Sequence, residues 1–186
     1  RGTVTQSEGR RGGGLRGRGV DVGVVDSSDH PEDLAAILEE AGLWMGGDLN
    51  EARDNLWFTL LFKHPSILAA PEQRFQQLVS LFLAAMSDDE STARPDLAIL
   101  GDLVSNGRPQ HDAPWLELRA ESLRRAIAAR DRSPAWGWKE PNTHIVADRL
   151  RAHIPRIKYI HVARSGLDMA FSQNQNQLSL WGPAVL

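Results

Sequence analysis

The feature that most constrains the fold is an alternation of strand-like runs with segments of helical periodicity. Short apolar runs with strand character occur at 20–25, 136–139 and 157–163. Helices are expected at 32–41, 50–63, 71–87, 95–104, 114–130, 142–153 and 167–178, from apolar spacing and from the turn and cap residues around them. Strands that alternate with helices favour a parallel sheet covered on both faces. In such folds, ligands bind at the carboxyl ends of the strands.

The composition is that of an ordinary globular chain. The 186 residues suffice for one domain with a core, since 41% of them are hydrophobic and 24% are charged. The net charge of −3 gives no basis for nucleic acid or an anionic membrane as a partner. The sequence has no cysteine, no apolar run long enough to span a membrane and no signal-peptide pattern. We therefore expect a cytoplasmic protein without a metal site.

Residues 1–19 differ from the rest of the chain. They are rich in Gly and Arg, and Val4 and Leu15 are the large apolar residues among them. A segment that buries so little apolar surface cannot offset the conformational entropy lost on ordering. We expect this segment to be disordered or foreign sequence, and we place the domain at 20–186.

The most informative polar residues follow the strand 157–163. Arg164 stands at its carboxyl end, and a turn at Gly166 leads into a helix. Asp168 in the first turn suits the helix dipole, and Ser172 lies one turn further on the same face. Arg164 and Ser172 could therefore bind one small anion together. The alternative is that Arg164 pairs with Asp168 and that Ser172 is merely exposed.

Several linked segments resemble a known family. They are WKEP at 138–141, IHVAR at 160–164 with the Asp and Ser that follow it, and DLNE at 48–51 after a Gly-containing loop at 44–46. In this combination the chain resembles the sulfotransferases that depend on 3′-phosphoadenosine 5′-phosphosulfate (PAPS), particularly the large bacterial sulfotransferase-domain group. The resemblance covers 32–182.

The resemblance implies an α/β, P-loop NTPase-like, three-layer fold with a central parallel sheet flanked by helices. It implies transfer of a sulfuryl group from PAPS to a hydroxyl or amine of a small-molecule or carbohydrate acceptor, with 3′,5′-ADP (PAP) as product and no metal. By the same resemblance, Arg164 and Ser172 contact the 3′-phosphate of the donor. Residues 20–186 would then be a partial sulfotransferase domain.

Lys139 and Glu140 are the candidate catalytic residues. A Lys at a strand end can neutralise charge on the transferring group or on its leaving phosphate, and Glu140 could accept the acceptor proton as general base. The alternative is a surface Lys–Glu pair that precedes a helix cap at Asn142. His144 is a weaker candidate base. Trp138 is expected to pack in the strand rather than to bind acceptor.

Asp48, Asn50 and Glu51 are the candidate acceptor-binding residues. They form a polar cluster at an expected helix start, where a carboxylate could bind the acceptor or act as base. The alternative is that Asp48 or Asn50 caps the helix. Trp57 and Phe58 could line the same cleft, but helical core packing is favoured.

The resemblance fails at the loop that should hold the 5′-phosphosulfate. Such a loop offers Gly, Ser or Thr and a basic residue after the first strand, here at 26–31. That segment reads DSSDHP, which lacks Gly, Lys and Arg and carries two carboxylates. Gly12, Gly13 and Gly14 are the alternative loop, although no strand precedes them. We therefore expect a fragment that catalyses poorly. The rival interpretations are a non-catalytic remnant of the P-loop fold and a nucleotide-binding phosphotransferase-like protein.

Overall fold

The computed structural model describes residues 21–26, 31–88, 95–129 and 135–162 of the chain. These ranges contain a three-stranded sheet of β1 (Asp21–Asp26), β2 (Trp136–Lys139) and β3 (Lys158–Val162), in the order β2-β1-β3. Both pairings are parallel, so that Val24 of β1 lies between Lys139 of β2 and Ile160 of β3. The carboxyl ends of the three strands therefore leave the sheet at one edge.

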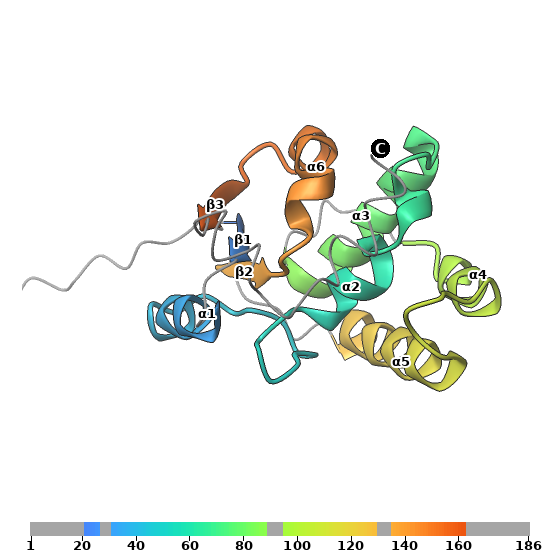
Figure 1. Cartoon of the computed structure of the whole chain (residues 1–186), viewed down its shortest axis with the longest axis horizontal. Coiled ribbons are helices and arrows are strands. Elements are labelled where there is room, and N and C mark those ends of the chain that lie inside the picture. Colours follow the sequence, from blue (N-terminus) through green and yellow to red (C-terminus); the bar gives the residue numbers. More distant parts are fainter. Residues whose placement is uncertain (1–20, 27–30, 89–94, 130–134, 163–186) are drawn as a thin grey trace, which may run out of the picture.

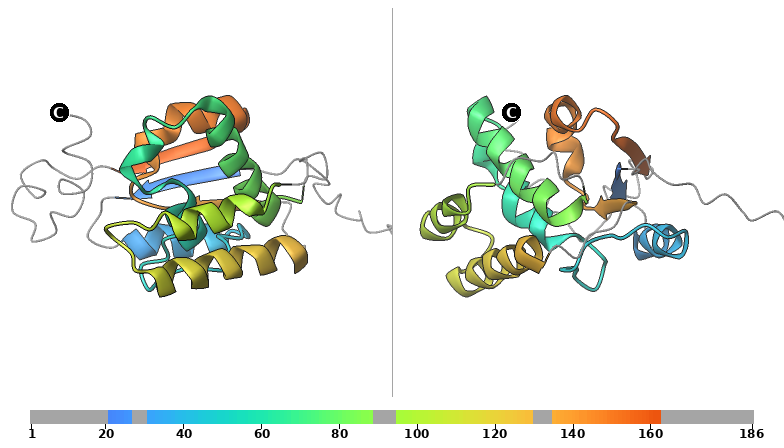
Figure 2. Two further views of the ribbon diagram at one scale, coloured as in Figure 1. Left: turned by 90° about the vertical axis from the view of Figure 1, so that its right-hand side faces the viewer. Right: turned by 180° about the vertical axis from the view of Figure 1, so that it is seen from behind.

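Helices lie on both sides of this sheet (Figure 1, Figure 2). They are α1 (Pro31–Glu40), α2 (Leu56–Phe62), the short 3₁₀ helix η1 (Pro65–Ile67), α3 (Glu72–Met86), α4 (Ala98–Ser105), α5 (Ala113–Ala129), the 3₁₀ helix η2 (Thr143–Val146) and α6 (Ala147–His153). In both figures α1 lies on one side of the sheet and α2, α3 and α6 lie on the other. α5 packs against α2 and α3, and α4 packs against α5. Membership of the P-loop NTPase-like class stays a prediction.

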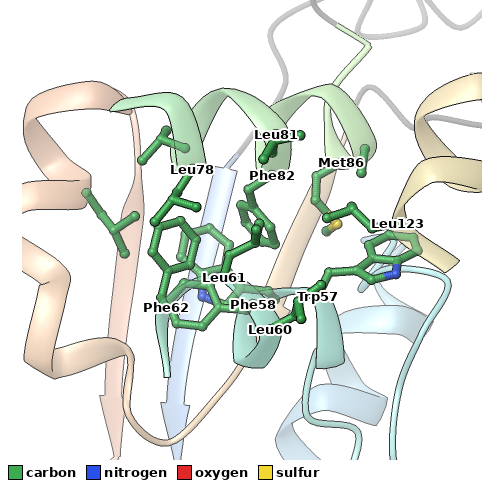
Figure 3. Close-up of a cluster of buried hydrophobic side chains, with 14 of the residues drawn as sticks. Trp57, Phe58, Leu60, Leu61, Phe62, Leu78, Leu81, Phe82, Met86 and Leu123 are labelled. Carbon is green, nitrogen blue, oxygen red and sulfur yellow. The ribbon is translucent and has the colours of Figure 1, made fainter. Parts of the chain in front are cut away.

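The core lies where α2 and α3 meet the sheet (Figure 3). All residues of α2 after Leu56 are buried, and a helix that is apolar on every side is stable only where other elements enclose it. Phe58 of α2 stacks on Trp138 of β2, with ring centroids 5.6 Å apart. Phe82 of α3 meets the same indole edge-on at 5.3 Å. Trp138 is therefore a core residue, and the prediction that it packs in the strand is confirmed.

Most of the expected helices lie where the periodicity places them. α3 begins and ends within one residue of 71–87, and α5 does the same for 114–130. The helix expected at 142–153 is split into η2 and α6, because it begins with a 3₁₀ turn. The predictions for residues 1–19 and for a helix at 167–178 concern segments outside the described residues.

The helix expected at 50–63 is wrong in its first turns. Residues 50–55 form a tight loop instead, in which Asp54 N–H donates to Asn50 Oδ1 at 2.7 Å. Arg53 has a φ of 60°, a left-handed conformation that a helix does not contain. The helix begins only after Asn55, whose side chain caps it by accepting from Phe58 N–H at 2.9 Å. Short polar side chains that bond their own backbone compete with helix formation, which explains the late start.

Within the described ranges, no helix is both long and apolar enough to cross a membrane.

Candidate functional site

The candidate site lies at the edge of the sheet where the strands end. Lys139 is the last residue of β2 and Glu140 follows it directly. Because β2 and β3 are both parallel to β1, the chain after β3 leaves from the same edge. Arg164 comes two residues after Val162, the last residue of β3, but Arg164 and Ser172 themselves lie outside the described residues, as do Gly12, Gly13 and Gly14.

The side chain of Lys139 is buried, and its ammonium contacts the 50–55 loop. Only 1% of it is exposed, and its Nζ donates to Asp54 Oδ1 at 2.5 Å and to the carbonyl oxygen of Ala52 at 2.9 Å. The backbone carbonyl of Lys139 also accepts from Asn55 N–H at 2.8 Å. A buried ammonium is tolerated when it is paired and hydrogen-bonded in this way. Lys139 therefore anchors the loop to the end of β2.

Glu140 points away from Lys139 and is even more enclosed, with no exposed side-chain area. Its Oε2 accepts from Asn142 N–H at 2.7 Å and its Oε1 accepts from Asn142 Nδ2 at 2.7 Å. Oε1 also lies 3.0 Å from Lys63 Nζ. The expected alternative of a surface Lys139–Glu140 pair is wrong, because successive residues at a strand end project to opposite faces and each charge has found a different partner.

Lys63 is a site residue that the sequence reasoning missed. It stands directly after α2 as its C-cap, where a cation is favoured by the helix dipole. Its side chain is 29% exposed, in contrast to the enclosed Lys139 and Glu140. The available signal was its position, since a lone basic residue ends the apolar run of α2. Among the described residues, Lys63 is thus a cation at this edge that is partly exposed to solvent.

The three candidate acceptor-binding residues do not converge. Asp48 turns toward α5, where its Oδ1 accepts from Arg119 Nη1 at 2.7 Å. Asn50 closes the turn over Asp54, with Nδ2 donating to Asp54 Oδ2 at 3.0 Å. Glu51 is exposed at the tip of the same loop. The cap on α2 that was considered for Asp48 or Asn50 belongs instead to Asn55.

A surface cleft of about 390 Å³ adjoins Asp48 and Arg119. Trp44 and Trp57 line it, and Trp57 Nε1 donates to Ser122 Oγ at 3.1 Å. Trp57 is buried and also lines this cleft, whereas Phe58 is wholly in the core, so the packing favoured for both residues is observed. That the cleft binds an acceptor stays a prediction. An aromatic cleft with a charged pair at its side is suited to an organic acceptor.

His144 is not part of this arrangement. It is exposed, and its Nδ1 lies 2.9 Å from the carbonyl oxygen of Pro141. Within the described residues, His144 forms no hydrogen bond with Glu140 or Lys139. The described part of the chain also holds no group of three His, Asp or Glu residues placed to bind a metal ion.

The buried charges of Lys139 and Glu140 thus belong to two separate ion pairs at the end of β2. Lys139 pairs with Asp54, and Glu140 pairs with Lys63. Such pairs can fix the backbone at the carboxyl edge of a sheet and can hold a cation toward an anionic ligand. Comparison with known proteins gave no match, whether to a family model, to a curated protein or to a solved structure.

Proposed function

We propose that the chain is part of a PAPS-dependent sulfotransferase, which moves a sulfuryl group to a hydroxyl or amine of a small-molecule or carbohydrate acceptor. The observation that carries the proposal is the parallel placement of β2 and β3 on either side of β1. It makes the Lys139–Glu140 segment and the chain leading to Arg164 leave the sheet at one edge. Ligands of open α/β sheets bind at that edge.

The proposed reaction assigns the two ends of the donor to two separate segments of the chain. Arg164 and Ser172 hold the 3′-phosphate, with Gly12, Gly13 and Gly14 as the proposed loop for the 5′ end. The acceptor atom forms a bond to sulfur, the bond from sulfur to the bridging oxygen breaks, and PAP leaves with the electron pair. The acceptor proton passes to a base.

Cations at the end of β2 support the charge that develops on the bridging oxygen. Lys139 was expected to supply the stabilising positive charge. Its ammonium already donates to Asp54 and to the carbonyl of Ala52. Lys63 is more exposed and is held by Glu140, so it supports the same role from the other side of the strand end. Electrostatic stabilisation of a developing anion requires such a preorganised group.

A non-catalytic remnant of the same fold is the second candidate. It is favoured by the two ion pairs at the end of β2, because both Lys139 and Glu140 already have partners that explain their burial without any substrate. In this case the charges at the edge serve only to fix the loop 50–55 and the start of η2.

Calorimetric titration with PAP tests the proposed 3′-phosphate site. We expect wild-type protein to bind PAP and Arg164→Ala to bind it roughly 10- to 100-fold more weakly, because charge-assisted hydrogen bonds to phosphate contribute on the order of 1.5–3 kcal/mol. Arg156→Ala is the matched control, since Arg156 is an exposed Arg in the segment before β3. Equal affinities for wild type and Arg164→Ala would remove the assignment of the 3′-phosphate site.

A further inference from the structure

The carboxyl-terminal end of α2 is capped by two basic side chains. Arg108 donates from Nη1 to the carbonyl oxygen of Thr59 at 3.0 Å, and from Nη2 to that of Leu60. His64 serves the next carbonyl, with Nε2 at 3.2 Å from Leu61 O. The Thr59 carbonyl also accepts from Lys63 N–H at 3.2 Å, whereas the carbonyls of Leu60 and Leu61 belong to the last turn, whose carbonyls lack partners within the helix. The cap explains why two basic residues lie partly buried here.

The cap leaves a charge uncompensated. Burial lowers the pKa of Arg108 to about 10, so the guanidinium is still charged at neutral pH. Burial, followed by the charge of Arg108, lowers the pKa of His64 to about 4, so this imidazole is neutral. Within the described residues no carboxylate lies within 4.0 Å of Arg108. The partial negative charge of a helix end compensates only about half of a full charge.

A cavity of about 500 Å³ opens beside this guanidinium, between η1, α3, α4 and the turn at 106–109. Leu78 and Leu103 are among its apolar walls, and Arg74 is a second cationic group that lines it. Arg74 is only loosely paired, with Nη1 3.8 Å from the exposed carboxylate of Asp102. The cavity therefore combines apolar walls with two guanidinium groups, and one of these has no acidic partner in the described residues.

We propose that this cavity binds a small organic monoanion, such as a carboxylate on an apolar body. The anionic head lies between Arg74 and Arg108, and the apolar body packs along Leu78 and Leu103. The volume is that of sites for small organic ligands. A cationic ligand is disfavoured by both guanidinium groups. A neutral apolar ligand would desolvate Arg108 further without supplying a counter-charge. This site is independent of the proposed sulfuryl transfer.

The test is a set of titrations monitored by NMR, with octanoate, octanol and octylamine as probes of one chain length and different charge. We expect octanoate to bind about tenfold more tightly than octanol, and octylamine to bind most weakly, because only the carboxylate gains charge-assisted hydrogen bonds. The shifted resonances are expected to include those of Leu78 and Leu103. Equal affinity for octanoate and octanol, or no binding of octanoate, would overturn the proposal.

Arg74→Gln is the informative variant, because Arg108→Gln would also remove the cap on α2. Arg124→Gln is its matched control, since Arg124 on α5 has a similar loose pair, with Nη1 3.8 Å from Glu121 Oε2. We expect Arg74→Gln to weaken octanoate binding about fivefold or more and to leave octanol binding unchanged. If both variants bound octanoate as wild type does, the head group would not lie at Arg74 and the proposal would be wrong.

Discussion

The buried pair of Lys139 and Asp54 allows the sharpest prediction of stability. The side chain of Lys139 is 1% exposed and that of Asp54 is 17% exposed. Asp54→Asn therefore leaves the ammonium of Lys139 buried, shielded from water and without a counter-charge. Breaking a buried pair from one side costs about 3 kcal/mol or more. Lys139→Met removes the buried charge instead and leaves a carboxylate that is partly hydrated, so we expect a smaller loss of about 1–2 kcal/mol.

Urea unfolding of the two single variants and of the double variant measures the coupling between these residues. We expect the double variant to be more stable than Asp54→Asn alone, because the uncompensated ammonium is gone, with a coupling free energy of about 1–3 kcal/mol. If Asp54→Asn unfolded at the same urea concentration as wild type, the ammonium of Lys139 would not be confined to this pair. Lys139 would then be free to act on substrate.

Three further changes probe the site and its surroundings. Glu140→Gln is expected to lower the free energy of unfolding by about 2 kcal/mol, because a fully buried carboxylate loses its ion pair; a change below about 0.5 kcal/mol, as is usual for surface positions, would count against its burial. Asn55→Ala removes the cap on α2 and is expected to cost about 2 kcal/mol in the same assay, and an unchanged urea midpoint would contradict that role. Hydrogen bonds from Arg149 and His153 hold the pKa of Glu72 below its ordinary value of 4.5, so their contribution is present above that pH and is lost as the pH falls through the lowered pKa. Glu72→Gln should therefore flatten the decline of the urea midpoint as the pH falls below 4.5, and a decline as steep as that of wild type would refute the assignment.

Local periodicity was sufficient to predict the long helices. α3 carries Phe75, Leu78 and Phe82 on one face, and each of them is buried in the core. The strand at 136–139 was predicted from its short apolar run, and β2 has these bounds. These signals are local, so they can be read from one segment at a time.

The arrangement of charges at the end of β2 could not be predicted in this way. The partners of Lys139 and Glu140 are Asp54 and Lys63, which lie far away in the sequence. Which charges meet depends on how α2 docks against β2, and the stacking of Phe58 on Trp138 that fixes this docking is itself a long-range contact. Sequence reasoning therefore found the strand end but assigned its charges to solvent or to substrate.

The loop 50–55 shows a second limit of local reasoning. The sequence reasoning extended α2 back over this polar segment, in which Ala52 is the one apolar residue. The turn depends on Asn50 bonding Asp54, and Lys139 then holds the closed loop against β2. Polar side chains that bond their own backbone override a weak helical preference when a tertiary contact favours the turn.

The affinity for PAP relative to 5′-AMP tests the central claim most directly, because the two nucleotides differ by the 3′-phosphate alone. Calorimetry on the wild-type chain under one buffer and salt condition gives both constants. The proposed sulfotransferase site predicts that PAP binds at least about tenfold more tightly, since Arg164 and Ser172 would contact that phosphate. Equal affinities, or no binding of either nucleotide, would contradict the proposal.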